Sequence, residues 1–318
     1  MINLASKTAF LFPGQGSQFI GMGHDLAAAY PAARQIFEEA DQILGFHLSR
    51  LAWEGPEVEL NDTINTQPAI LIHSTAVLAV FQQLFPGFQA AFTAGHSMGE
   101  LSALIAAGAL PFPDALRLVR RRGELMKQAG VVSPGGMAAI MGLDIPVLDQ
   151  LCSQASRLDQ EPPEVVQVAN DNCPGQVVIS GSSQALERAL QLAQQAGARR
   201  VIPLAVSIAA HSPLMSMAQA SFNQAVADAP ITRAVVPLVG NVTASPLVQA
   251  GQVRADLQAQ LTHRVRWTET IQYMISQRIS TFIEMGNGTV LTGLLKRINR
   301  DATGINLGTP ADFAKLAN

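Results

Sequence analysis

A serine lies between two glycines in Gly95-His96-Ser97-Met98-Gly99, where a predicted apolar strand (90–94) runs into a predicted apolar helix (101–107). Glycines at this spacing permit the sharp strand-to-helix turn that exposes a nucleophilic hydroxyl at the carboxyl edge of a sheet. The free N–H groups and positive dipole end of the helix would face that hydroxyl. We therefore predict Ser97 as a nucleophile and the backbone N–H of Met98 as an oxyanion donor. A glycine-lined turn with an incidental serine is the alternative.

A serine nucleophile needs a base, and the chain has six histidines. His96 adjoins Ser97 on a sharp turn, so its side chain is expected to point away. His73 falls inside an apolar helix and is interpreted as a core histidine. His211 precedes Ser212-Pro213, a typical N-cap and first-turn pair, and a helix N-terminus favours the neutral imidazole that a base requires. We predict His211 as the base, with a loop histidine satisfied by water as the alternative.

An arginine interrupts the apolar face of the helix predicted over 113–129. At 3.6 residues per turn Arg122 falls inside the apolar stripe, whereas three other arginines fall on the opposite side and are expected to be solvated: Arg117, Arg120 and Arg121. A buried guanidinium is unfavourable unless it meets an anion. That anion is either a carboxylate of the protein itself or an anion that arrives with a substrate. In the second case the planar guanidinium of Arg122 would hold the anion through two hydrogen bonds.

Charged side chains are scarce: they make up 14% of the 318 residues, against about 25% in an average domain, and the formal net charge is −3. This composition argues against a disordered chain and against nucleic-acid binding. Two cysteines make no disulfide framework, and Cys173 is interpreted as a small buried residue. Residues 1–6 lack the pattern of a signal peptide, and no apolar run is long enough to cross a membrane. We expect a cytoplasmic protein.

Strands, turns and helices alternate in residues 1–134 and 205–318, which predicts a large α/β domain with a parallel sheet. The segment 135–204 has the order β-α-β-β-α-β of a ferredoxin-like unit and is interpreted as an inserted small domain. The expected strands are 8–12, 90–94, 137–143, 165–169, 176–180, 200–204, 235–239 and one ending at 284–286. The expected helices are 19–42 with a break near Pro31, 67–84, 101–107, 113–129, 145–155, 183–196, 213–227, 253–261 and 267–278.

The turn Gly14-Gln15-Gly16 follows the first strand and is a weak candidate for a dinucleotide loop. The third glycine of that pattern is absent because position 19 is Phe, and no acidic residue ends a second strand. Small residues after a strand can instead bring backbone N–H groups to an oxyanion.

These motifs together resemble the malonyl-CoA:acyl carrier protein transacylases, the standalone acyltransferases of fatty-acid and polyketide synthesis. The resemblance covers nearly the whole chain and rests on segments that follow in order: Phe12-Pro13-Gly14-Gln15-Gly16-Ser17-Gln18, Gln67-Pro68-Ala69, Gly95-His96-Ser97-Met98-Gly99-Glu100, Arg122-Gly123, Asn172-Cys173-Pro174-Gly175-Gln176, His211-Ser212, Gly286-Asn287-Gly288 and Leu291-Thr292-Gly293-Leu294. The family's fold, a hydrolase-like α/β domain with a ferredoxin-like insertion, agrees with the predicted elements.

The resemblance implies a ping-pong acyl transfer from malonyl-CoA to the phosphopantetheine thiol of an acyl carrier protein, through a malonyl ester on Ser97. It also implies that the N–H groups of Gln15 and Met98 hold the oxyanion, that Arg122 holds the malonyl carboxylate, and that the backbone carbonyl of Gln260 orients His211. No cofactor, metal or membrane is implied, and a monomer is expected.

Two alternatives stay open at this point. Ala210, before the histidine, replaces a larger residue of many malonyl-specific members, so the enzyme could accept α-substituted malonyl groups. A carrier-protein acyl hydrolase would share the serine and histidine but should lack Arg122. A non-catalytic docking subunit is disfavoured by the intact Ser97 and His211. Two short basic runs could steer an acidic carrier protein: Lys296, Arg297 and Arg300, or Arg120, Arg121 and Lys127.

Overall fold

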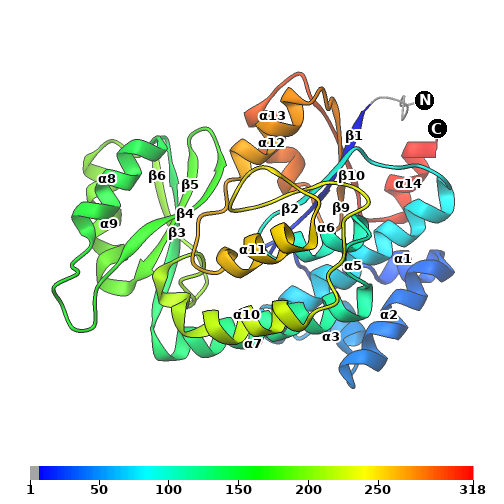
Figure 1. Ribbon diagram of the computed structural model, residues 1–318, viewed down its shortest axis with the longest axis horizontal. Helices are drawn as coiled ribbons and strands as arrows, with labels where there is room; N and C mark the ends of the chain where they lie inside the picture. Colours follow the sequence, from blue (N-terminus) through cyan, green and yellow to red (C-terminus); the bar gives the residue numbers. More distant parts are fainter. Residues whose placement is uncertain (1–6, 318) are drawn as a thin grey trace.

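The computed structural model describes residues 7–317. The prediction that residues 1–6 lack the pattern of a signal peptide concerns residues outside this range. Two sheets organise the chain, as Figure 1 shows. The large sheet has the strand order β10-β9-β1-β2-β7-β8, and the small sheet has the order β4-β5-β3-β6. The small sheet lies at one end of the molecule, on the left of Figure 1, and the last helix, α14 (Pro310–Ala317), lies at the other.

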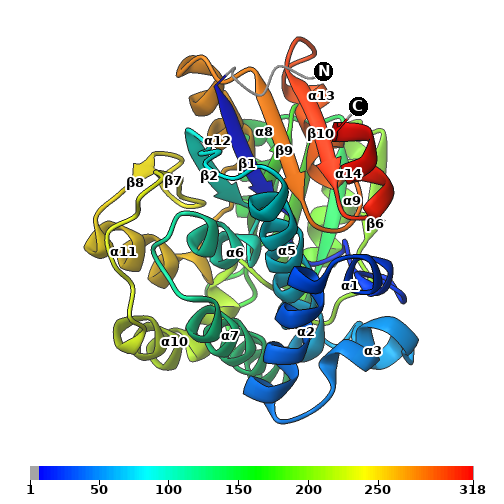
Figure 2. The same ribbon diagram turned by 90° about the vertical axis from the view of Figure 1, so that its right-hand side faces the viewer.

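The large sheet is parallel except at one edge. β1 (Thr8–Phe12) pairs in parallel with β2 (Phe92–Gly95) and with β9 (Thr281–Met285), and β9 pairs with β10 (Thr303–Leu307). β1, β9 and β10 run side by side in Figure 2. The strand predicted over 235–239 shortens to β7 (Leu238–Val239), which pairs antiparallel with β8 (Pro246–Leu247).

Both faces of the large sheet are buried, as is usual for parallel sheets. Side chains alternate along β1: Phe10 and Phe12 enter one core with α5 (Thr63–Leu84) and α6 (Gly99–Ala106). Ala9 and Leu11 enter another with α12 (Trp267–Ser276) and α13 (Val290–Ile298). The sheet therefore holds its strand ends rigidly between two helical layers.

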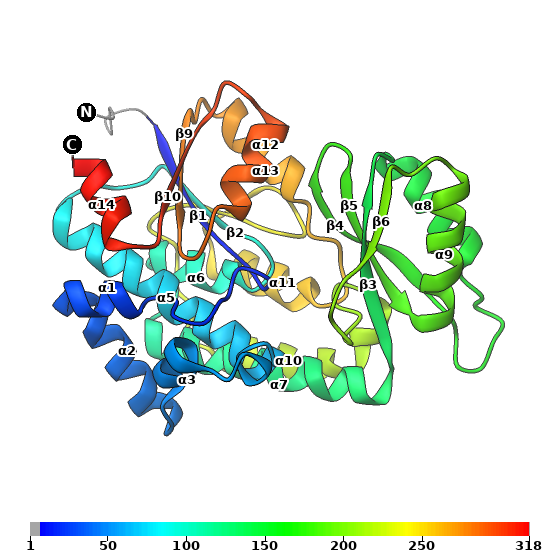
Figure 3. The same ribbon diagram turned by 180° about the vertical axis from the view of Figure 1, so that it is seen from behind.

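The small sheet contains β3 (Gly135–Met141), β4 (Val166–Cys173), β5 (Gln176–Ser182) and β6 (Arg200–Pro203), all paired antiparallel. Two helices, α8 (Ile145–Ala155) and α9 (Ser183–Gln195), enclose a separate apolar core with it. α7 (Phe112–Val132) runs along the part of the molecule that contains the large sheet, which we call the large body, and leads into β3 (Figure 3). The predicted fold class, a parallel α/β sheet with a ferredoxin-like βαββαβ unit, is confirmed.

Several helix boundaries differ from the prediction. The helix expected over 19–42 begins only at α1 (His24–Ala29), because Gly21 and Gly23 adopt positive φ angles of 97° and 77°. The helix expected over 213–227 divides into a 3-10 turn (Pro213–Met215) and α10 (Ser216–Asp228). The remaining helices are α2 (Pro31–Leu44), α3 (Leu48–Glu54), α4 (Glu57–Leu60), α11 (Ala250–Gln260) and α14 (Pro310–Ala317).

Among residues 7–317, one helix, α5, is apolar and long enough to cross a membrane by length and composition alone. Most of it is enclosed by other elements, since 83% of its most apolar window is buried. It packs against α2 and α7 as a central core helix. Its predicted core histidine, His73, is buried at 2% exposure, with Nε2 at 3.0 Å from the carbonyl oxygen of Gly308.

The prediction of a solvated Arg120 is wrong. Its side chain is only 26% exposed, and Nη1 donates to the carbonyl oxygen of Ile64 at 3.1 Å and to Asn65 Oδ1 at 2.9 Å. Pro68 explains the contact, because a proline in α5 has no N–H to donate to the carbonyl four residues earlier. The guanidinium of Arg120 takes the place of that missing donor.

Candidate active site

The turn around Ser97 joins β2 to α6 under backbone strain. Ser97 has a φ of 52°, in the left-handed region that a non-glycine residue rarely adopts. A Cβ atom added to Gly95 would lie 2.0 Å from the carbonyl carbon of Gly99. A Cβ atom added to Gly99 would lie 2.3 Å from the carbonyl oxygen of Phe12. Both glycines are therefore required for the close approach of strand, turn and helix that projects the hydroxyl.

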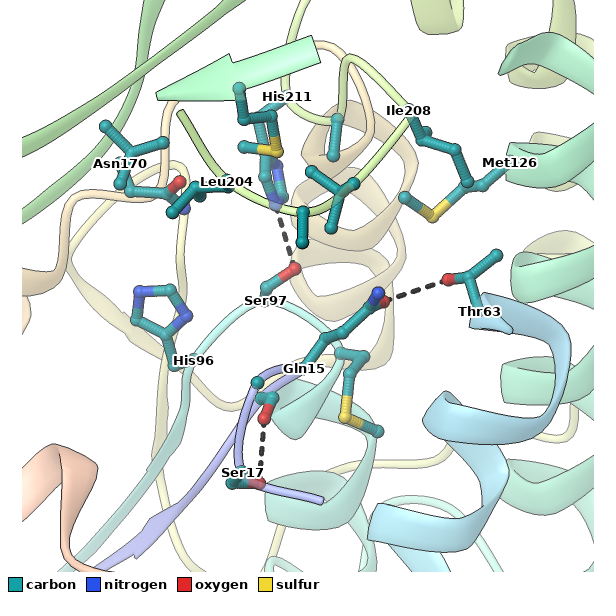
Figure 4. A pocket seen from close by; sticks show the side chains of 18 of the residues that line it. Gln15, Ser17, Thr63, His96, Ser97, Met126, Asn170, Leu204, Ile208 and His211 are labelled. Carbon is teal, nitrogen blue, oxygen red and sulfur yellow. Dashed lines mark hydrogen bonds between the residues drawn. The ribbon is translucent and has the colours of Figure 1, made fainter. Parts of the chain in front are cut away.

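Ser97 Oγ lies 2.8 Å from His211 Nε2. Figure 4 marks this contact with a dashed line and shows that the side chain of His96 points away from the hydroxyl. His211 Nδ1 lies 2.8 Å from the backbone carbonyl oxygen of Gln260. With its proton on Nδ1, the ring donates to that carbonyl and accepts the Ser97 proton at Nε2. The two residues and the carbonyl named from the sequence thus meet in one chain of contacts.

The neutral state of His211 has a different main cause from the one expected. Only a three-residue 3-10 turn follows the residue, and burial is the largest influence on its pKa, followed by the positive charge of Arg122. Together they lower the pKa of His211 to about 3. The imidazole is consequently unprotonated at neutral pH and able to accept a proton.

Arg122 is 2% exposed, yet none of the ion pairs found among residues 7–317 includes it. Nη1 donates to Gln67 Oε1 at 2.8 Å, and Nη2 donates to Gln260 Oε1 at 2.8 Å and to Ser97 Oγ at 3.1 Å. Burial lowers the pKa of Arg122 to about 10, so it stays charged at neutral pH. Its immediate partners are neutral, and its charge remains available to an anion in the cavity.

A cavity of about 800 Å³ opens beside these residues, between the two sheets. Its walls include Arg122 and His211 from the large body and Met137, Asn170 and Asn172 from the small sheet. This volume suits an extended organic substrate.

Gln15 and Met98, the residues predicted to supply oxyanion-binding amides, both line the cavity together with Ser97. The turn after β1 reaches the elbow because Gly14 has no side chain: an added Cβ would lie 2.5 Å from the carbonyl oxygen of His96. Among residues 7–317, neither amide N–H has a hydrogen-bond acceptor. Free N–H groups at this place have the character of an oxyanion hole.

Three residues that fix this arrangement have no role that could be assigned from sequence alone: Asn241, Gln67 and Thr63. Asn241 Oδ1 accepts from the Ser97 N–H, and Asn241 Nδ2 donates to the Gly95 carbonyl oxygen, both at 2.8 Å, so it clamps the elbow. Gln67 Nε2 donates to Thr63 Oγ1, which donates to Gln15 Oε1, each at 2.9 Å. Gln67 was visible as part of a family motif, whereas Asn241 and Thr63 carry no local signal.

The other sequence candidates have structural places. Cys173 is fully buried and burial raises the pKa of its thiol, in keeping with the small buried residue expected. Arg297, in one of the two basic runs, donates to Gln176 Oε1 and to the carbonyl oxygen of Pro174. Over residues 7–317, no group of three or more His, Cys, Asp or Glu side chains could hold a metal ion.

Comparisons with known proteins agree with this geometry. The profile of the acyl transferase domain matches residues 9–309. The chain is 46% identical over 305 residues to the malonyl CoA-acyl carrier protein transacylase of Bacillus subtilis strain 168, which covers 96% of this chain and 94% of that protein. It is similar to the crystal structure of an acyl carrier protein S-malonyltransferase from Vibrio cholerae, with 42% identity, a TM-score of 0.93 and coverage of 98% and 100%. A second similar structure is a malonyl-transacylase in complex with its type II PKS acyl-carrier protein, with 41% identity, a TM-score of 0.93 and 98% coverage of both chains.

Proposed function

Because the chain belongs to the acyl transferase domain family, among its malonyl CoA-acyl carrier protein transacylases, we propose that it transfers a malonyl group from malonyl-CoA to the phosphopantetheine thiol of an acyl carrier protein. The observation that carries the proposal is the position of Ser97 Oγ, 2.8 Å from a neutral histidine nitrogen and 3.1 Å from an unpaired guanidinium. The proposed enzyme acts in the cytoplasm as a monomer and serves fatty-acid or polyketide synthesis.

In the first half-reaction, Ser97 Oγ attacks the thioester carbonyl carbon of malonyl-CoA while His211 Nε2 takes the hydroxyl proton. The N–H groups of Gln15 and Met98 stabilise the negative charge on the carbonyl oxygen. The carbon–sulfur bond then breaks, His211 returns the proton to the leaving sulfur, and CoA departs. A malonyl ester of Ser97 remains.

The second half-reaction runs the same steps in the opposite direction with a different thiol. His211 takes the proton of the phosphopantetheine thiol, and the sulfur attacks the ester carbonyl carbon. Collapse of the tetrahedral intermediate returns the proton to Ser97 Oγ and releases the malonyl thioester of the carrier protein. These steps need no cofactor beyond the phosphopantetheine that the partner carries.

Arg122 distinguishes this proposal from a carrier-protein acyl hydrolase. A malonyl group carries a free carboxylate, and a guanidinium with only neutral partners supplies its counter-charge in a buried place. An unsubstituted acyl chain offers Arg122 no such anion and would leave its charge unpaired in an apolar environment.

The direct test incubates the purified protein with an equimolar mixture of acyl-CoAs and a panel of acyl carrier proteins and weighs the carrier products. The proposal predicts malonyl-loaded carrier as the main product. Hydrolysed acyl-CoA without loaded carrier would support the hydrolase instead. Equal loading of malonyl and methylmalonyl groups would support the relaxed specificity that Ala210, at the cavity wall, leaves open.

A further inference from the structure

Two carboxyl groups lie buried together behind the catalytic serine and histidine. Glu100, in the first turn of α6, is 0% exposed, and Asp256 on α11 is 2% exposed. The two side chains are within hydrogen-bonding contact of each other. Two ionised carboxylates in such a contact repel strongly, so a buried pair of this kind holds one proton between them.

The donors around the pair are unequally divided. Asp256 accepts from the N–H of Val242 at 3.2 Å, and from the N–H and the hydroxyl of Thr243 at 3.0 Å and 2.9 Å. Glu100 Oε2 accepts from Gln260 Nε2, and a hydrogen bond from the backbone of Asn241 also favours the ionised form of Glu100, but Glu100 Oε1 is a buried atom without a partner in the geometric hydrogen bonds of residues 7–317. An orphan oxygen that faces another carboxyl is explained if it carries the proton.

Gln260 connects this pair to the reacting groups. Its Nε2 also donates to the Ser97 carbonyl oxygen at 3.0 Å, its Oε1 accepts from Arg122, and its backbone carbonyl oxygen lies 2.8 Å from His211 Nδ1. A carboxyl that anchors Nε2 therefore fixes the direction of Oε1 toward the guanidinium. Among residues 7–317, Glu100 is also the acidic group whose charge acts on Arg122.

We propose that Glu100 and Asp256 share one proton, with Glu100 as the neutral acid, and that Glu100 acts through Gln260 as a positioning residue that leaves the Arg122 charge for the substrate carboxylate. An ionised Glu100 would supply Arg122 with an internal counter-charge and compete with the substrate. Burial first, and then the charge of Asp256, raise the pKa of Glu100 well above its ordinary range, in agreement with this assignment.

The inference rests on the proposed malonyl transfer and is tested by the selectivity between malonyl-CoA and acetyl-CoA, because acetyl carries no carboxylate. In the variant Asp256→Asn, the side-chain amide N–H introduced at position 256 can donate to Glu100, which favours the ionised form of Glu100. We expect the ratio of kcat/KM for malonyl to that for acetyl to fall on the order of tenfold, mainly through the KM for malonyl-CoA. The double variant Glu100→Gln with Asp256→Asn removes the new charge and should restore the ratio. Asp228→Asn, the control, makes the same chemical change at an exposed position and should leave the malonyl-to-acetyl ratio unaltered.

An unchanged ratio in Asp256→Asn, or a double variant no better than the single one, would overturn the proposal. Infrared spectroscopy of the substrate-free protein tests for the shared proton without measuring turnover. Because it does not use Asp256→Asn, its result does not depend on whether that variant folds. The carbonyl stretch of a protonated carboxyl should be present in the unaltered protein at neutral pH and reduced in Glu100→Gln. Identical spectra would also overturn the shared proton, whereas failure of the parent enzyme to transfer malonyl would overturn the proposed function alone.

Discussion

The backbone carbonyl oxygen of Gln260 lies 2.8 Å from His211 Nδ1, where many serine enzymes have a carboxylate side chain. A carbonyl fixes the ring orientation and keeps the proton on Nδ1, but it adds no full negative charge. His211 therefore remains neutral beside the positive Arg122. The arrangement provides a base for Ser97 without introducing an anion that would compete with a substrate carboxylate.

Replacement of Arg122 should change substrate preference more than overall competence. In Arg122→Ala the malonyl carboxylate loses its charged, two-pronged partner, and we expect malonyl loading to fall roughly 100-fold or more. Acetyl loading should change much less. Rates of acyl-enzyme formation with both CoA thioesters, with Arg117→Ala on the exposed face of α7 as the control, measure the difference. Equal losses for the two substrates would contradict the carboxylate role.

Asn241 should be required for the shape of the elbow irrespective of the acyl group. Asn241→Ala removes the acceptor of the part-buried Ser97 N–H and the donor to the buried Gly95 carbonyl oxygen. We expect a loss of about 1–3 kcal/mol in the free energy of unfolding and a similar fall in kcat for malonyl and acetyl loading. A selective effect on malonyl alone would show that the residue acts on the carboxylate instead.

The contact of Arg120 with α5 should depend on Pro68. Arg120→Ala removes the donor to the Ile64 carbonyl oxygen, which should lower the free energy of unfolding by about 1–2 kcal/mol. In a Pro68→Ala background the new N–H at position 68 can donate to that carbonyl, and the cost of Arg120→Ala should shrink. Urea unfolding of the four proteins measures this coupling, with Arg121→Ala as the control. Strictly additive effects would contradict it.

Acid should destabilise the fold through His73. Burial lowers the pKa of His73 to about 4, against 6.5 for the free side chain, so the unfolded chain binds this proton first as the pH falls. The stability from neutral His73 is present above pH 6.5 and is lost as the pH falls toward 4. In His73→Gln the dependence should flatten by about 1.4 kcal/mol per pH unit over that window. Urea unfolding at several pH values in this window measures how the free energy of unfolding depends on pH, with His24→Gln, at an exposed position, as the control. The same pH dependence in His73→Gln and in the unaltered protein would contradict the role given to His73.

The sequence could predict what depends on local pattern. The strand at 8–12, the elbow glycines and the inward face of Arg122 each follow from a short segment, since turn geometry and helical period are local properties. Local pattern also distinguishes His211 from His73, which falls inside an apolar helix, and from His96, which adjoins Ser97 on a sharp turn.

What the sequence could not predict depends on contacts between distant segments. The pairing of Glu100 with Asp256 joins α6 to α11, and the donation from Arg120 to α5 joins two helices whose approach no local pattern specifies. The roles proposed for Gln15 in the oxyanion hole and for Gln260 in orienting His211 use backbone atoms, which every residue type has, so only the family resemblance pointed to these two residues. β10 was missed because its central positions are only partly buried and carry little apolar signal.

A covalent malonyl ester on Ser97 is the intermediate on which the proposed reaction depends, and intact-mass spectrometry after brief incubation with malonyl-CoA tests for it most directly. The unaltered protein should gain the mass of one malonyl group, and the gain should disappear when a carrier protein with its phosphopantetheine is added. Ser97→Ala should show no gain while its circular dichroism spectrum stays that of the folded protein. A malonyl adduct that persists in Ser97→Ala would contradict the account.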